Sequence, residues 1–244
     1  MIKNRKHITY TIFILLLILN ISMWFYHKSM KPIWGNVPES PSQSALLFIS
    51  LGDKEASYRF YSQILQNMGE TGGENRMFSE YNYKNIGQWL TNLHNLSPDS
   101  DLIPYVGAYY YGATRDPAQI PYIIDFLRIA GHGGGKQDWR WLVQAIYMSK
   151  HIKNDLPLAL ELAEELSSLY RPDMPAWTLQ MPAFISMDLG DKEAAYQLSM
   201  EILSYGVDKF EPAEILFIKE YICTRVLGED GSKVNALCSN KKEP

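Results

Sequence analysis

The chain has 244 residues, of which 46% are hydrophobic and 20% charged, and these proportions exclude wholesale disorder and fibrous classes. Two cysteines are too few for a disulfide-scaffold fold or a four-cysteine zinc site. The net charge of −4 is unevenly distributed: residues 1–31 carry five basic and no acidic residues, and the rest carries 18 basic and 27 acidic residues. Because nucleic-acid binding needs a basic face, this acidic body argues against nucleic acid as a partner.

The first predicted element is one transmembrane helix over residues 8–26, preceded by a cytoplasmic tail of residues 1–7. The run ITYTIFILLLILNISMWFY contains no charged residue and would extend about 28 Å as a helix. A cleaved signal peptide is the alternative, but it has a shorter apolar stretch and small residues before the cut, which residues 22–27 lack. Basic residues are more numerous before the span, which predicts a cytoplasmic N-terminus and a body outside the cytoplasm, periplasmic in a bacterium.

A spacer and a helical domain follow the predicted anchor. Residues 27–44 include the Pro- and Ser-rich run KPIWGNVPESPSQS, which is typical of a linker. From residue 45 to residue 228 the apolar residues recur with a helical period and no run alternates as a strand would, so we predict an all-α domain. The polar residues 229–244 are predicted to form a loose tail.

The strongest internal signal is a repeated segment. Residues 51–65 (LGDKEASYRFYSQIL) and 189–203 (LGDKEAAYQLSMEIL) are identical at nine of fifteen positions, and their offset of 138 is close to four times 34. A period of 34 residues is typical of helix–turn–helix repeats. In each copy the glycine is expected to end one helix, and the aspartate that follows it to cap the next.

These residues resemble the tetratricopeptide repeat, in which a Gly-Asp turn joins two helices. Weaker units of similar length cover residues 98–130, 138–170 and 175–206, and residues 211–227 would form a closing cap. The resemblance implies a right-handed α-α superhelix, a solenoid of about four to five helix pairs, that binds other proteins.

Chemistry-bearing patterns are weak. The run GHGGGK at residues 131–136 lacks the strand and the spacing of a phosphate loop, and Gln137 stands where Ser or Thr is needed. The five histidines form no close pair with a second metal ligand, and Glu161 and Glu165 fit a solvated helix face. We therefore expect no catalysis, no cofactor and no metal.

The two cysteines, Cys223 in the last predicted helix and Cys238 in the tail, are 15 residues apart. An oxidising compartment would allow a disulfide between them that ties the tail down. Free thiols are the alternative.

Aromatic residues supply the candidate binding site. Several rings share one helix and point in different directions, because each residue turns the helix by about 100°. Packing in the core is the alternative to exposure on the concave face, where such rings would anchor a partner. The protein-binding candidates are Tyr105, Tyr109, Tyr110, Trp139, Arg140 and Trp141.

The sequence therefore predicts a membrane-anchored, non-enzymatic adaptor or assembly factor. Its partners would be other membrane or envelope proteins, together with the lipid bilayer through residues 8–26. A permanent accessory subunit of a larger membrane complex is the alternative, and an envelope enzyme with an unrecognised site is the third. A concave aromatic groove would favour the adaptor, and a wide apolar face would favour the subunit.

Overall fold

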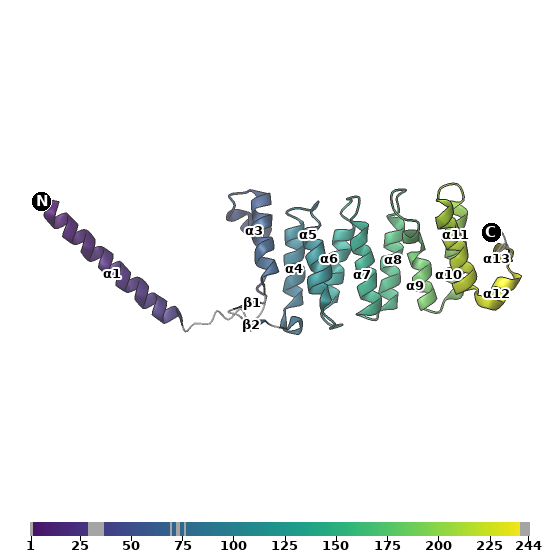
Figure 1. The fold of residues 1–244 in the computed structure, drawn as a ribbon, viewed down its shortest axis with the longest axis horizontal. Helices are drawn as coiled ribbons and strands as arrows, with labels where there is room; N and C mark the ends of the chain where they lie inside the picture. Colours follow the sequence, from purple (N-terminus) through teal and green to yellow (C-terminus); the bar gives the residue numbers. More distant parts are fainter. Residues whose placement is uncertain (1, 29–36, 69, 72–73, 76, 240–244) are drawn as a thin grey trace.

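The structure, a computed structural model, describes residues 2–28, 37–68, 70–71, 74–75 and 77–239. These residues fold almost entirely into helices, which confirms the all-α class (Figure 1). The exception is a pair of two-residue antiparallel strands, β1 (Glu70–Thr71) and β2 (Glu74–Asn75). This pair lies in the segment that joins α3 to α4.

The helices follow one another in chain order with short connections. The first half contains α1 (Ile2–Lys28), α2 (Gln43–Phe48), α3 (Lys54–Gln66), the 3-10 turn η1 (Phe78–Glu80), α4 (Tyr83–His94), α5 (Leu102–Tyr105), the π-helical segment η2 (Val106–Tyr110), the 3-10 turn η3 (Tyr111–Ala113) and α6 (Pro121–Gly131). The second half contains α7 (Trp139–His151), α8 (Leu156–Ser168), α9 (Trp177–Asp188), α10 (Lys192–Gly206), α11 (Pro212–Tyr221), the π-helical segment η4 (Ile222–Val226), α12 (Gly228–Val234) and α13 (Ala236–Ser239).

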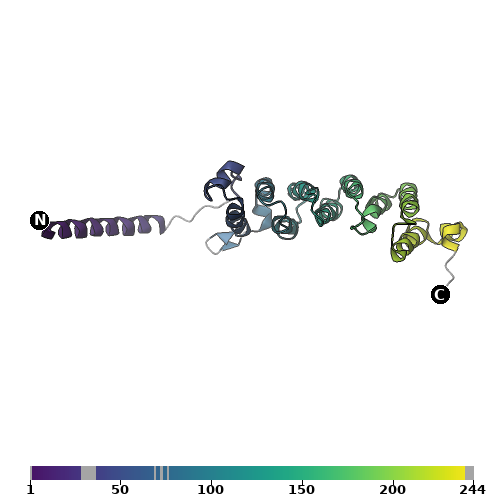
Figure 2. The same ribbon diagram turned by 90° about the horizontal axis from the view of Figure 1, so that it is seen from above.

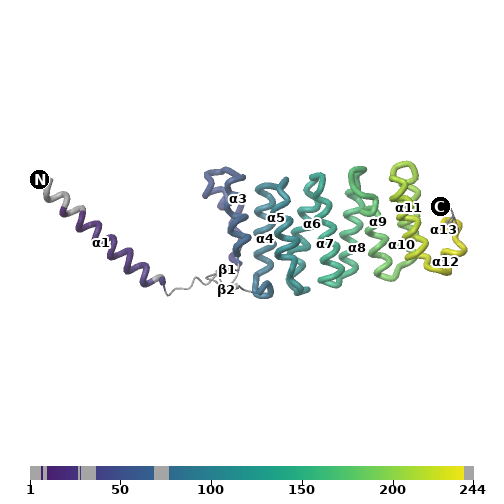
Figure 3. Tube along the Cα trace, viewed as in Figure 1, coloured from purple at the N-terminus to yellow at the C-terminus, as the bar shows by residue number. Residues whose placement is uncertain are grey.

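From α3 to α11 the helices stand side by side and alternate in direction (Figures 1 and 3). Seen from above, they are staggered in two layers (Figure 2). From α6 to α10 neighbouring helices in the chain pack most closely, whereas α4 packs chiefly against α6. Segment α5 continues through η2 and η3 without a break and acts as one member of this row. The result is an elongated row of helices rather than a bundle around a central axis.

The core runs along the row between the two layers. Its largest fully buried side chains include Tyr83, Tyr111 and Phe126. The Tyr111 hydroxyl donates to the Leu65 carbonyl at 2.7 Å, and the Tyr83 hydroxyl donates to the Tyr111 carbonyl at 3.0 Å. Each buried hydroxyl thus has a partner, and together they join α3, α4 and η3.

Both copies of the repeated turn have the predicted cap. The Asp53 carboxylate accepts from the Ala56 amide at 3.0 Å, and the Asp191 carboxylate accepts from the Ala194 amide at 2.9 Å. The preceding glycine has a positive φ in both, 94° at Gly52 and 84° at Gly190.

The interpretation of the 138-residue offset as four whole units does not match the structure. Helices α3 to α9, seven members of the row when α5, η2 and η3 are taken as one, lie between the α2–α3 turn and the α9–α10 turn. Because successive helices alternate in direction, the two turns lie at opposite ends of the helices (Figure 1). The repeated sequence therefore encodes a type of turn and cap, and not a fixed place in a pair of helices.

The predicted spacer of residues 27–44 differs from the structure at both ends. Helix α1 extends to Lys28, and Val37 is buried against the body. The segment from Val37 to Pro41 follows α4, whose side chains donate hydrogen bonds to its carbonyls. Residues 29–36 lie outside the described residues. The linker is therefore shorter than its composition predicts, because polar α4 side chains hold its second half.

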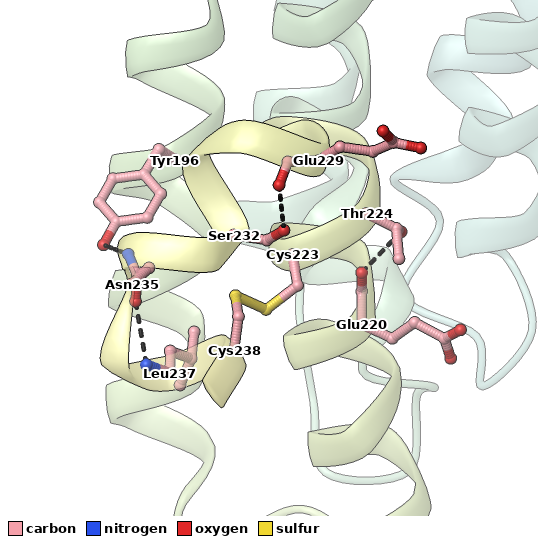
Figure 4. The surroundings of a disulfide bond; sticks show 9 residues. All are labelled: Tyr196, Glu220, Cys223, Thr224, Glu229, Ser232, Asn235, Leu237 and Cys238. Carbon is pink, nitrogen blue, oxygen red and sulfur yellow. Dashed lines mark hydrogen bonds between the residues drawn. A yellow bond between two sulfur atoms is a disulfide. The ribbon is translucent and has the colours of Figure 1, made fainter. Parts of the chain in front are cut away.

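The predicted loose tail is also partly folded. Residues 228–239 form α12 and α13 after the predicted closing helix, which is α11 with η4. The structure joins Cys223 and Cys238 in a disulfide, with Cα atoms 5.7 Å apart (Figure 4). Asn235 Nδ2 donates to the Tyr196 hydroxyl at 3.3 Å, which attaches the same segment to α10. Residues 240–244 lie outside the described residues.

The predicted anchor lies within α1, a continuous helix of 27 residues. The large apolar side chains described between Tyr10 and Tyr26 are exposed. The side chains of Ile8 and Thr9, where the predicted span begins, lie outside the described residues. Within the described residues, no helix combines the length and the hydropathy needed to cross a membrane.

Candidate binding groove

A π-helical turn sets the direction of the candidate tyrosines. Segment η2 follows α5 directly and ends at Tyr110. Such wide turns are rare and often occur at functional sites, because they change the direction of the side chains that follow. Here Tyr109 points outward with 51% of its surface exposed, and Tyr111 is fully buried.

Four of the six predicted residues line one cavity of about 320 Å³. Tyr105 and Tyr109 lie on one side, with ring centroids 4.8 Å apart, and Tyr105 is 57% exposed. Arg140 and Trp141, from the first turn of α7, lie on the other side. The remaining lining residues are Asp101 and Gln137. The cavity is therefore open, aromatic and formed between α5–η2 and the start of α7.

A second cavity, of about 470 Å³, continues from the first along α7. It shares Tyr109 and is otherwise lined by residues of η2, η3, α7 and the residue that follows α7: Ala108, Gly112, Ala113, Val143, Gln144, Tyr147, Met148 and Ile152. The two cavities share Tyr109 and lie between the same pair of segments, so they adjoin each other. We refer to both together as the α5–α7 groove.

The other two predicted residues do not line this groove. Trp139 is only 8% exposed and packs edge-on against Trp177, with ring centroids 5.7 Å apart. Tyr110 packs against Phe78 at 5.2 Å. The helical twist turns Trp139 about 200° away from Trp141, and Tyr110 about 100° from Tyr109, so neighbours in sequence do not share a surface. Trp139 belongs to the core, as the packing alternative predicts.

The candidate residues predicted from the sequence do not include Gln137, Gln144 or Tyr147, which also line the groove. These residues follow the face of Arg140 and Trp141 at helical spacing, so extending that face along α7 would have found Gln144 and Tyr147. Tyr147 also packs its ring against His151 at 4.8 Å. What the sequence does not show is that η2 lies opposite this face.

Several polar side chains of the groove have no hydrogen-bond partner among the described residues, and Arg140 lies over the Trp139 ring at 5.7 Å. The side chains of Tyr105, Tyr109, Gln137, Trp141 and Gln144 make no hydrogen bond to any other residue that the structure describes. The phenol, indole and amide groups all include N–H or O–H donors. The groove therefore presents flat apolar rings together with several unused donors.

Carboxylates outside the groove serve the packing of helices. Arg128 of α6 forms ion pairs with Glu161, at 2.6 Å, and with Glu165, both of α8. Hydrogen bonds from Glu165 first, and then Glu161, raise the pKa of the Arg128 guanidinium. The two carboxylates keep solvent exposure, 54% at Glu161 and 22% at Glu165, and α6 in addition brings a cation next to them, which the sequence did not predict.

The glycine-rich run of residues 131–136 is held by a local hydrogen bond, in which the Asp138 carboxylate accepts from the Gly135 amide at 2.7 Å. In the part of the chain that the structure describes, no group of three or more His, Cys, Asp or Glu side chains is arranged to hold a metal ion.

Comparison with known proteins finds no family model, no curated protein and no solved structure that matches this chain.

Proposed function

We propose that this protein is a membrane-anchored adaptor or assembly factor that binds a segment of another envelope protein and carries out no catalysis. The observation that carries the proposal is the α5–α7 groove, where exposed tyrosines and unused hydrogen-bond donors meet. Tyr and Trp are favoured at binding sites because each presents a rigid apolar ring with a polar edge. The row of helices is proposed to be a tetratricopeptide-like solenoid whose surface carries this groove.

In this proposal α1 is the transmembrane anchor, with the N-terminus in the cytoplasm and the helical body outside it. Anchoring confines the body to the membrane surface, which raises its effective concentration toward other membrane-bound proteins. A groove of modest affinity is then sufficient for capture.

The test is a crosslinking pull-down of the full-length protein from its native membrane, followed by mass spectrometry. The variant Tyr105→Ala plus Tyr109→Ala removes the exposed rings of the groove. Its matched control is Tyr122→Ala plus Tyr205→Ala, two exposed tyrosines outside the groove. We expect the groove variant to lose one or a few partners that the control retains, with unchanged helical circular dichroism. Equal recovery in both variants would contradict the proposal.

A permanent accessory subunit is the second candidate. Large apolar side chains are exposed at two places outside the groove: Phe48, Ile49 and Leu51 at the α2–α3 turn, and Leu216 and Phe217 on α11. Exposed apolar surface of this kind is typical of proteins that remain in a complex. Stoichiometric recovery of a fixed set of membrane proteins, unchanged by the groove variant, would support this candidate.

A further inference from the structure

The protein already binds one extended, proline-containing segment, and the segment is its own. The chain from Val37 to Pro41 (VPESP) is held against α4 by side chains that donate to its backbone carbonyls. Asn85 Nδ2 donates to the Val37 carbonyl at 2.6 Å, Trp89 Nε1 to the Pro38 carbonyl at 2.9 Å, and Asn92 Nδ2 to the Pro41 carbonyl at 3.2 Å.

These three donors have a definite spacing, an amide at i, an indole at i+4 and an amide at i+7. On a helix these positions lie along one face, one turn apart. An extended chain laid along that face therefore meets one donor at each turn. Three side chains of α4 thus bind a segment that contributes mainly carbonyl oxygens.

The same spacing occurs at α7. Residues 85–92 read NIGQWLTN and residues 137–144 read QDWRWLVQ, so Trp141 and Gln144 of α7 correspond in sequence to two donors of α4, and Gln137, in the turn just before α7, corresponds to the third. In both places the tryptophan is largely buried and the leucine after it, Leu90 or Leu142, is fully buried. The two helices therefore set their tryptophans in similar environments. The set on α4 is filled by Val37–Pro41, whereas the set on α7 lines the α5–α7 groove and has no hydrogen-bond partner among the described residues.

We infer that the α5–α7 groove binds an extended, proline-containing segment of a partner protein in the way that α4 holds Val37–Pro41. This inference rests on the proposed function and specifies the ligand of the same groove. The carbonyls of the segment accept from Gln137, Trp141 and Gln144, and its proline rings pack on Tyr105 and Tyr109.

The chemistry of the two surfaces is complementary. Proline has no backbone N–H, and a polyproline II segment makes no internal hydrogen bonds, so its carbonyls are free to accept. The groove supplies donors and aromatic faces, which is how proline-rich segments are recognised elsewhere. A helical ligand would use its carbonyls internally and would leave the donors of the groove unpaired.

The test uses the full-length protein in lipid nanodiscs and a fluorescent synthetic peptide, VPESPSQS, which corresponds to residues 37–44. A second peptide carries alanine in place of both prolines, and a third is an amphipathic helix of similar length. We expect saturable binding of the first peptide below millimolar concentration and clearly weaker binding of the other two.

Variants then locate the bound peptide. Trp141→Phe keeps the ring and removes one donor, so we expect the dissociation constant to rise about threefold to tenfold. Gln137→Ala plus Gln144→Ala removes two donors without touching the buried ring and gives the same direction of change if Trp141→Phe fails to fold. The matched control is Trp177→Phe on α9, outside both donor sets, which is expected to leave peptide affinity unchanged. Trp89→Phe on α4 tests whether the peptide exchanges with the protein's own segment.

Several outcomes would overturn the inference. The first is that the peptide shows no saturable binding up to about 2 mM, a concentration that would detect a site with a binding free energy of about 4 kcal/mol. The second is that the protein binds the helical peptide more tightly. The third is that Trp89→Phe weakens peptide binding and the α7 variants do not. The last result would mean that the peptide exchanges with the protein's own segment on α4. None of these removes the adaptor proposal, because the pull-down reports loss of partners from the groove whatever conformation they bind in.

Discussion

Individual buried polar side chains in this protein depend on single partners. Burial raises the pKa of Tyr83 to about 12 and raises that of Tyr111 further. Both phenols therefore stay protonated and act as donors across the physiological pH range. His94 is the contrasting case, since its Nδ1 atom is buried with no hydrogen-bond partner among the described residues.

The first prediction concerns the Tyr111 hydroxyl. Tyr111→Phe removes the hydroxyl that donates to the Leu65 carbonyl, which keeps the Met68 amide as a donor at 3.2 Å, so we expect the free energy of unfolding to fall by about 0.5–1.5 kcal/mol. Thermal or urea denaturation followed by circular dichroism measures this. Tyr109→Phe is the control, because its exposed hydroxyl has no partner among the described residues. A loss of the same size in both variants would show that the buried bond does not matter.

The second prediction is a pH dependence of stability from His94. Burial lowers the pKa of its imidazole, with a weaker opposite effect from Asp138, so the unfolded chain binds a proton at pH values where the native protein does not. The neutral His94 imidazole makes its full contribution to the free energy of unfolding above about pH 6.5. That contribution is lost as the pH falls from there toward the native pKa of His94, and the free energy of unfolding decreases by at most about 1.4 kcal/mol per pH unit.

Measuring unfolding free energy between pH 5.5 and pH 7.5 checks this. His94→Leu should remove the part of the slope that comes from this site. His151→Leu is the control, since that side chain is exposed and forms no ion pair with any residue that the structure describes. An unchanged slope in His94→Leu would assign the pH dependence to other groups.

At the scale of elements, the same six residues, Leu-Gly-Asp-Lys-Glu-Ala, form two turns with equivalent caps and different leucine conformations. Leu51 has a φ of 53° and is 95% exposed, whereas Leu189 remains helical and is 42% exposed. The left-handed region is uncommon for a branched side chain, so the α2–α3 turn holds Leu51 at a conformational cost. The local sequence thus determines the cap, and the packing of each turn determines where its leucine points.

The third prediction tests that cap. Asp191→Ala removes the acceptor for the Ala194 amide at the start of α10, and we expect a loss of about 1 kcal/mol in unfolding free energy. Asp191→Asn keeps a side-chain oxygen at the same place and should recover most of that stability. Chemical denaturation of the three proteins in parallel decides this, and equal stability of all three would mean that the side chain does not cap α10.

At the scale of the whole molecule, α1 and the helical row differ in character. The row has a buried core in two clusters, a large one that extends from Val37 to Ile185 and a smaller one formed mainly by α10 and α11, and α1 exposes its apolar side chains. Our proposal assigns α1 to the bilayer and the row to the far side of the membrane, where an oxidising compartment would maintain the Cys223–Cys238 disulfide.

The fourth prediction tests this topology by labelling with a membrane-impermeant maleimide. We expect Lys192→Cys, an exposed position in α10, to react in intact cells, and Lys3→Cys to react only after the membrane is permeabilised. The unsubstituted protein is the control and should not react, because both native cysteines are bonded. The reverse pattern would place the body in the cytoplasm. Loss of an N-terminal tag from the mature protein would show that the segment is cleaved.

Some features follow from the sequence by itself because they depend on local chemistry. Hydrophobic periodicity predicted the all-α class, and the Gly-Asp pairs predicted where two helices end and begin. Both need only neighbouring residues, since a cap bonds within one turn and an apolar stripe is a property of one helix. The aromatic composition of the groove was also visible at Tyr105, Tyr109, Arg140 and Trp141.

Only the tertiary structure decided the rest, because it depends on contacts between residues far apart in the chain. A spacer rich in Pro and Ser is shortened by its bonds to α4, and carboxylates that were expected in solvent meet Arg128. Trp139 and Trp141 are both buried in the core, and of the two Trp141 also lines the groove, because the facing segment η2 lies on its side of α7. Composition shows which side chains can bind a partner, and the arrangement of the helices determines which of them remain accessible.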